Sequence, residues 1–211
     1  METKNPNVEL RPSHTPAGQP IIYFTFDDGP AENTPDVLAA LAENNAKATF
    51  FVLGGQVKAH PDLLRAEAEA GHYIANHTFS HPSLQGIARD IFMTEMTETA
   101  EIVQETVGDM FKLDGRMYLM RPPYGHTDDN TAVWARELGY DMVLWTIDPW
   151  DWNTPGTEAI VTQVLAEAQP GAIVLLHDGG GDRSQTAAAL RQILPALAEQ
   201  GYVFRNLYLG W

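Results

Sequence analysis

The chain has 211 residues, 44% of them apolar, which is enough to bury one sizeable core within a single domain. Its formal charge of −15 argues against affinity for nucleic acid or for an anionic membrane surface, because both need basic patches. The absence of cysteine excludes disulfides and thiolate metal sites, and no apolar run approaches the length of a membrane span. We therefore expect neither nucleic-acid binding nor membrane insertion.

Residues 1–19 are polar, contain proline and lack the charged start and apolar middle of a signal peptide, so we predict a tail or linker stub there. Residues 20–211 are expected to form one domain, because short apolar runs alternate with amphipathic segments, the pattern of βα units. The runs predicted as strands are IIYFTF (21–26), ATFFVL (48–53), HYIAN (72–76), MYLM (117–120), MVLWTI (142–147), AIVLL (172–176) and YVF (202–204).

The segments between these runs have apolar residues at three-to-four spacing, which predicts helices. They cover residues 34–45, 61–71, 90–108, 131–139, 157–168 and 184–201. The strands are apolar on both faces, as in a parallel sheet covered by helices. This pattern favours a closed or partly closed α/β barrel, and an open doubly wound sheet is the alternative that periodicity leaves open.

Polar residues follow five of the predicted strands. DDGP comes after the first, NHTFSH after the third, RPPYG after the fourth, DPWDW after the fifth and HDGG after the sixth. In a β/α barrel the segments after the strands gather on one face, where active sites are built. We expect these five segments to meet there.

His77 and His81 lie four residues apart in HTFSHP, the spacing of zinc-binding histidine pairs. Because Pro82 disfavours helix at His81, we expect a short turn or a helix end. Two exposed loop histidines are the alternative. An aspartate of DDGP supplies an anionic third ligand, and two histidines with one carboxylate leave an open position for water, as in catalytic zinc sites.

In metalloproteases the residue after the first histidine is a glutamate that acts as general base, but here it is Thr78. The base must therefore come from elsewhere. We expect one aspartate of the pair Asp27–Asp28 to bind the metal and the other to take the proton from water. Strand geometry would separate the two side chains, whereas the turn at Gly29–Pro30 can bring both to the barrel mouth. A turn or helix cap is the alternative.

Further candidates lie in the remaining motifs. His177 ends a buried strand and suits a general acid, and Arg121 can hold the base carboxylate ionised. A backbone N–H at Tyr124 can serve a developing oxyanion. Trp150 and Trp152 offer flat apolar faces to sugar rings, of which we expect one at most to meet substrate. The carboxylate that supports His177 can be either of two: Asp148 or Asp151.

Taken together, these motifs resemble those of the polysaccharide deacetylases, carbohydrate esterase family 4, also called the NodB-homology domain. TFDDGP, HTFSH, RPPYG, DPWDW and LLHD stand in the family's order and cover the chain from about Ile21 to its C-terminus. The resemblance implies an α/β fold, a distorted (β/α) barrel of seven or eight strands in a single domain. It also implies metal-dependent removal of acetyl groups from carbohydrate.

Carried over by position, the resemblance implies Asp27 as the general base, with Asp28, His77 and His81 as metal ligands. Thr78 corresponds to a residue that buttresses the histidine loop.

For the other residues, the resemblance implies that Arg121 holds the base, that the Tyr124 N–H stabilises the oxyanion and that Leu175 lines the pocket for the acetyl methyl. His177 corresponds to the general acid, supported by Asp151 or Asp148.

The expected substrate is carbohydrate containing N-acetylglucosamine, such as chito-oligosaccharide, chitin or peptidoglycan, and the expected ion is Zn²⁺, with Co²⁺ or another divalent ion compatible with the site. We expect a monomer that is secreted or in the cell envelope, its signal segment absent from this chain. One rival is an O-acetyl esterase acting on acetylxylan. The other is a carbohydrate-binding module without catalysis, whose sign would be replacement of Asp27, His77, His81 or His177.

Overall fold

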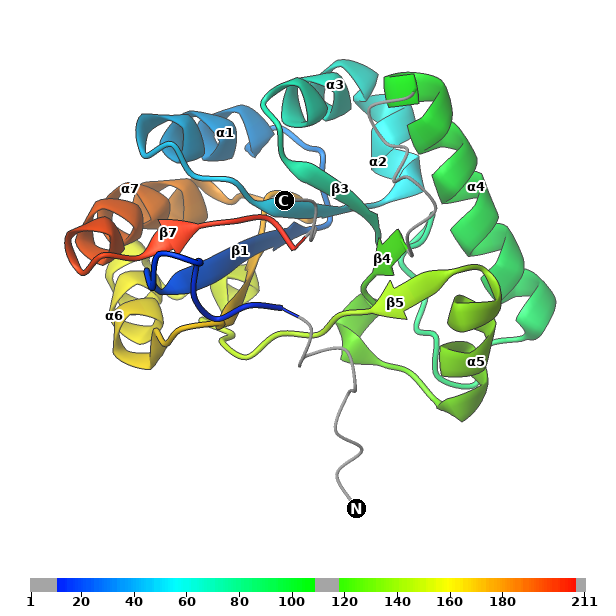
Figure 1. The fold of residues 1–211 in the computed structure, drawn as a ribbon. Coiled ribbons are helices and arrows are strands. Elements are labelled where there is room, and N and C mark those ends of the chain that lie inside the picture. Colours follow the sequence, from blue (N-terminus) through cyan, green and yellow to red (C-terminus); the bar gives the residue numbers. More distant parts are fainter. Residues whose placement is uncertain (1–10, 109–117, 208–211) are drawn as a thin grey trace.

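The computed structural model describes residues 11–108 and 118–207. Over these residues strands and helices alternate as expected (Figure 1). The strands are β1 (Ile21–Asp27), β2 (Thr49–Val52), β3 (Tyr73–Asn76), β4 (Tyr118–Met120), β5 (Tyr140–Met142), β6 (Ile173–His177) and β7 (Val203–Phe204). The α-helices are α1 (Thr34–Glu43), α2 (Gly54–Ala59), α3 (Pro61–Glu69), α4 (Arg89–Val107), α5 (Asp129–Glu137), α6 (Thr157–Glu167) and α7 (Ser184–Glu199).

The strands form one parallel sheet that curls into an incomplete barrel. Its order is β5-β4-β3-β2-β1-β6, and β7 pairs with the start of β1. Figure 1 shows the helices around the outside of the sheet, with α1, α6 and α7 on one side and α4 and α5 on the other. The expectation of a distorted α/β barrel in a single domain is confirmed. Within the described residues, no helix has the length and apolar character needed to cross a bilayer.

One strand prediction is wrong, in the segment that runs between β5 and β6, the two edge strands of the sheet. The run 142–147 shares only Met142 with β5, which ends there. Beyond Met142 the backbone crosses from one edge of the sheet to the other: Val143 N still donates to Met120 O on β4, whereas Thr146 N and Ile147 N donate to Ile173 O on β6. The apolar run 142–147 therefore connects the two edges of the sheet through hydrogen bonds to β4 and β6.

Helix α2 is absent from the sequence-based prediction because it begins with two glycines, which break the apolar pattern. The structure explains the first of them. A Cβ on Gly54 would lie 2.4 Å from Cδ2 of Phe79 and 2.8 Å from Oγ1 of Thr99, so only glycine fits. The other six predicted helices are present. Met117, predicted as the start of β4, lies outside the described residues.

Alternation along β1 divides the core into two layers. Ile22, Phe24 and Phe26 face the surrounding helices and pack with residues of α1, α6 and α7. Tyr23 faces the barrel interior, where it packs with Phe51 and other strand residues. The strands are therefore apolar on both faces, as expected for a helix-covered parallel sheet.

The N-terminal segment was predicted as a tail over residues 1–19. Residues 1–10 lie outside the described part of the chain. The following residues pack on the sheet, since Ser13 O accepts the Ile21 N–H at 2.8 Å and Pro12 O accepts the Tyr23 hydroxyl at 2.8 Å. The domain boundary at residue 20 stays a prediction.

Candidate active site

A cavity of about 350 Å³ lies at the carboxyl ends of the strands. The loops after β1, β3, β4, β5 and β6 supply its walls, as the sequence predicted from the five polar motifs. Its lining residues are Asp27, Asp28, His77, His81, Tyr124, Trp145, Asp148, Trp152, Leu175 and His177. Nine of these ten residues were candidates from the sequence, Trp145 being the exception.

The two adjacent aspartates reach the same cavity because the backbone turns between them. Asp27 is the last residue of β1 and is 2% exposed. Asp28 has a φ of 71°, in the left-handed region, which turns its side chain back toward the barrel mouth. As a result His77 Nε2 lies 3.6 Å from Oδ2 of Asp27 and 3.5 Å from Oδ1 of Asp28.

Asp28, His77 and His81 form a cluster that can hold a metal ion. Their ligand atoms all lie within 4.8 Å of one another. Oδ1 of Asp28 lies 3.5 Å from His77 Nε2 and 3.3 Å from His81 Nε2, yet this oxygen is buried and accepts no hydrogen bond. A buried carboxylate oxygen without a partner is expensive unless a cation neutralises it, so this donor set fits a divalent cation.

The imidazole of His77 presents a lone pair to the centre of this cluster. Nδ1 of His77 lies 2.8 Å from the Arg121 carbonyl and can contact it only as a donor, which leaves Nε2 unprotonated in the neutral ring. Burial lowers the pKa of His77 to about 3, so the neutral form is the stable one. The motif lies in a loop that bends at Phe79 and Ser80, and the Thr78 hydroxyl accepts the His81 N–H at 3.1 Å.

Arg121 is fully buried behind Asp27. Its Nη1 donates to Asp27 Oδ1 at 2.7 Å and to Thr25 Oγ1 at 2.8 Å, and its Nε donates to the Val143 carbonyl at 3.1 Å. Its guanidinium also lies 4.1 Å from the ring centroid of Phe51. Burial raises the pKa of Asp27, while the Arg121 charge and hydrogen bond oppose that rise. The predicted contact between Arg121 and the neighbouring carboxylate is present.

His177 faces Asp27 from the neighbouring strand, since the two residues are paired in the β1–β6 register. Its Nδ1 lies 2.7 Å from Oδ1 of Asp151, whose Oδ2 accepts the His177 N–H at 2.9 Å and the Thr186 hydroxyl at 2.8 Å. Burial disfavours the charged ring, but the hydrogen bond and charge of Asp151 outweigh it and raise the pKa of His177. The sequence left Asp148 and Asp151 as alternative partners for His177, and in the structure Asp151 contacts the His177 ring.

Asp148 lies elsewhere on the cavity wall. Its Oδ1 accepts the Trp150 N–H at 2.9 Å, and burial raises the pKa of its carboxyl. The two indoles stack with centroids 5.7 Å apart, but only Trp152 lines the cavity. Tyr124, 61% exposed, stands at the rim and packs edge-on against His81 at 4.5 Å.

Two residues near the cavity had no signal in the sequence-based prediction. Trp145 belongs to the run interpreted as a strand, and its ring lies 5.5 Å from the Arg121 guanidinium. Arg183 is 5% exposed and donates from Nε to the Gly179 carbonyl at 2.8 Å and from Nη2 to the Gly180 carbonyl at 2.9 Å. An isolated arginine after HDGG gives no pattern to recognise, so only its contacts show that it holds this loop.

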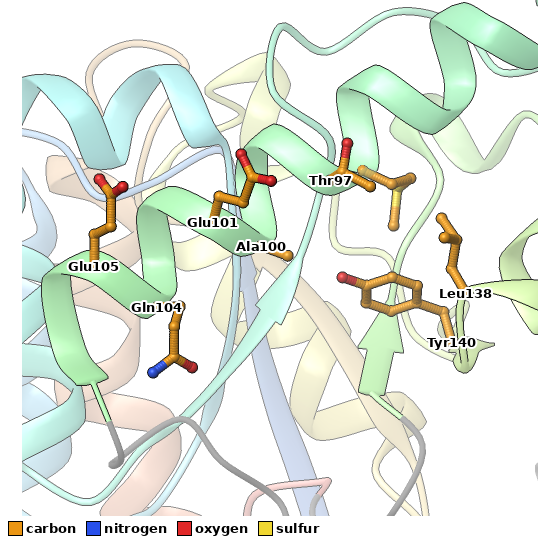
Figure 2. A pocket seen from close by; sticks show the side chains of 8 residues that line it. Thr97, Ala100, Glu101, Gln104, Glu105, Leu138 and Tyr140 are labelled. Carbon is orange, nitrogen blue, oxygen red and sulfur yellow. The ribbon is translucent and has the colours of Figure 1, made fainter.

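A second and larger cavity, of about 450 Å³, lies between α4 and β5. Figure 2 shows the side chains that line it, with Tyr140 and Leu138 beside the helix that carries Glu101 and Glu105. Its lining has these two carboxylates but no histidine or aspartate. Of these two cavities, only the smaller one holds the aspartates and histidines described above.

Comparison with known proteins places these observations in a family. The family model described as polysaccharide deacetylase matches residues 14–143. A chitooligosaccharide deacetylase of Sinorhizobium fredii is 39% identical over 201 residues, which cover 90% of this chain and 91% of that protein. A peptidoglycan-N-acetylglucosamine deacetylase of Bacillus cereus is 41% identical over 204 residues, with 93% and 92% covered.

A solved structure agrees with both sequence relatives. It is a peptidoglycan N-acetylglucosamine deacetylase in complex with 4-naphthalen-1-yl-N-oxidanyl-benzamide. Its TM-score to this chain is 0.81 at 34% sequence identity, with 89% of this chain and 86% of that chain covered.

Proposed function

Because the chain belongs to the polysaccharide deacetylase family, we propose that it is a metal-dependent hydrolase that removes acetyl groups from carbohydrate containing N-acetylglucosamine and releases acetate. One observation carries this proposal. The unpartnered Oδ1 of Asp28 and the Nε2 atoms of His77 and His81 converge in a cavity whose wall also holds Asp27 and His177. The relatives named for chito-oligosaccharide and for peptidoglycan identify the substrate class.

Zn²⁺ is the ion we propose for the cluster of Asp28, His77 and His81. The three ligand atoms lie within 4.8 Å of one another, and Asp28 Oδ1 lies 3.5 and 3.3 Å from the two imidazole nitrogens, so these three residues would hold a small divalent ion. When bound, such an ion polarises the acetyl carbonyl and lowers the pKa of water at the open position to roughly 7.

Two residues of the chain itself, Asp27 and His177, carry out the proton transfers. Asp27 takes a proton from the attacking water, and Arg121 holds its carboxylate in place through the 2.7 Å hydrogen bond. His177, kept protonated by Asp151, gives a proton to the departing amine. The attack adds a water oxygen to the acetyl carbon and breaks the bond to nitrogen, so the products are acetate and a free sugar amine.

The remaining cavity residues bind and orient the substrate. Leu175 and Trp152 form the apolar wall that accepts the acetyl methyl and one face of the sugar. The Tyr124 N–H is positioned by the turn at Pro123–Gly125, in which Tyr124 has a φ of 59°, and we assign it to the oxyanion that develops on the acetyl oxygen.

Acetate release from chito-oligosaccharide, peptidoglycan fragments and acetylated xylan tests this function. Release from the first two that stops with a chelator and returns with Zn²⁺ or Co²⁺ supports it. Preference for acetylated xylan indicates an O-acetyl esterase, and sugar binding without any acetate release indicates a binding module.

The role assignment makes a prediction for two variants. Asp27→Asn should lower kcat by about 10²–10⁴-fold while metal binding persists, because it removes the base and leaves the three ligands. His77→Ala should lose the metal first. Turnover assays paired with metal analysis after dialysis separate the two effects, and full turnover in both variants would refute the assignment.

A further inference from the structure

The histidine loop, residues 77–81, carries two of the three proposed metal ligands, and each of its backbone N–H groups has an acceptor. The His77 N–H donates to the Val52 carbonyl on β2, the Thr78 N–H to the side chain of Asn76, and the His81 N–H to the hydroxyl of Thr78. These three acceptors belong to the loop, to the residue before it or to the adjacent strand.

The two central N–H groups depend on a residue further along the chain. Phe79 N and Ser80 N both donate to Oε2 of Glu95, at 2.8 and 2.7 Å, and the Ser80 hydroxyl donates to its Oε1 at 2.6 Å. Hydrogen bonds to a carboxylate are roughly twice as strong as neutral ones. Glu95 therefore closes the turn that lies between His77 and His81.

Met96, the residue after Glu95 in α4, holds the start of the same loop. The Met96 carbonyl accepts a hydrogen bond from Nδ2 of Asn76 at 3.0 Å, and Oδ1 of Asn76 accepts the Thr78 N–H at 2.8 Å. One turn of α4 thus anchors the loop at its beginning and at its centre.

The loop needs such an anchor because its backbone is strained. Thr78 has a φ of 73° and His81 a φ of 64°, in the left-handed region that is unfavourable for residues other than glycine. Without external hydrogen bonds, the loop would relax toward conformations in which the two imidazoles no longer face Asp28.

We propose that Glu95 is a positioning residue for the metal centre: it holds the histidine loop so that His77 and His81 face Asp28 before an ion binds. The inference rests on the proposed function only in taking Asp28, His77 and His81 as a metal site. It assigns Glu95 no contact with ion or substrate.

The test measures Co²⁺ binding without any turnover. The dissociation constant, from competition with a chelator, and the visible spectrum of bound Co²⁺ are compared for the parent, Glu95→Ala, Glu95→Gln and the control Glu98→Ala. Glu98 is an exposed residue of the same helix and carries the same charge. We expect Glu95→Ala to weaken Co²⁺ binding by about 10–100-fold and to change the spectrum.

Glu95→Gln should restore only part of the affinity and bind Co²⁺ at least threefold more weakly than the parent, because its amide oxygen can still accept both N–H groups but lacks the carboxylate charge. Glu98→Ala should match the parent. Equal affinity and identical spectra in the parent and Glu95→Ala would overturn the proposal, as would an equal loss in Glu98→Ala. If Glu95→Ala does not fold, Glu95→Gln decides: binding at least threefold weaker than in the control supports the proposal, and binding equal to the parent overturns it. Acetate release by the parent enzyme is scored separately, so loss of the proposed function and loss of this inference are distinct results.

Discussion

At the scale of single residues, Asp27 and Asp28 show how two identical side chains acquire different surroundings. Asp27 is buried and already hydrogen-bonded to Arg121. Asp28 has left the strand and keeps a buried oxygen without any hydrogen bond. Arg121 is itself held by Thr25 and by the Val143 carbonyl, so the two carboxylates cannot exchange positions without moving the barrel interior.

The contact between His177 and Asp151 predicts a change in the pH profile of the enzyme. Asp151 raises the pKa of His177, so the protonated acid persists to higher pH than an ordinary histidine would allow. Asp151→Asn removes that support, and the alkaline limb of kcat/KM should move to lower pH. A rate profile from acid to alkaline pH measures the shift.

Asp148→Asn is the matched control for that profile. Asp148 contacts the Trp150 N–H instead of the His177 ring, so its replacement should move the alkaline limb less. An equal or larger shift in the Asp148 variant would show that Asp151 is not the principal partner of His177.

At the scale of elements, the active site is built where parallel strands end. The register of β1 with β6 sets Asp27 beside His177, and that of β2 with β3 sets Val52 beside Asn76, the residue before the histidine loop. Loops alone could not hold these groups so closely, because the hydrogen bonds of the sheet fix the register of neighbouring strands and so the positions of their ends.

His72, the residue before β3, should make the stability of the protein depend on pH. Nδ1 of His72 accepts the Ala48 N–H at 3.1 Å, and burial lowers the pKa of His72 to about 4 from 6.5. The unfolded chain therefore binds this proton more readily than the folded chain does. As the pH falls from 6.5 toward 4, folding should lose up to about 3 kcal/mol from this group.

The variant His72→Gln tests that dependence, since glutamine keeps an acceptor and cannot titrate. Free energies of unfolding from urea titrations at several pH values between 7 and 4 should fall more steeply in the parent than in the variant. Parallel slopes would mean that His72 does not contribute.

At the scale of the whole molecule, the proposed metal site joins parts of the chain that lie far apart. Asp28 follows β1, whereas His77 and His81 follow β3. A chain that has unfolded does not bring these groups together, so an ion that binds them stabilises only the folded state.

Thermal unfolding should therefore respond to metal. At an ion concentration about 100 times the dissociation constant, the folded state gains roughly 2.7 kcal/mol, and the Tm should rise. A chelator should reverse the rise, and His81→Ala should abolish most of it. A Tm that is the same with Zn²⁺, with chelator and in the variant would contradict the site.

The sequence was informative wherever a local pattern carries the signal. Strand and helix periodicity predicted six of the seven strands and six of the seven α-helices over the described residues. It failed for α2, whose first glycine, Gly54, is required by a close contact with Phe79, and for the run 142–147, whose apolar residues serve to bridge two strands. Both failures come from contacts between segments that are distant in sequence.

Residue types and their order were enough to suggest a two-histidine, one-carboxylate site with a neighbouring base, because those side chains have few chemical uses in common. Only the folded chain could separate Asp151 from Asp148, or distinguish Glu95 from the other glutamates of α4. Which atoms meet depends on backbone dihedral angles and strand register, and these are set by packing over the whole barrel instead of by the neighbours of each residue.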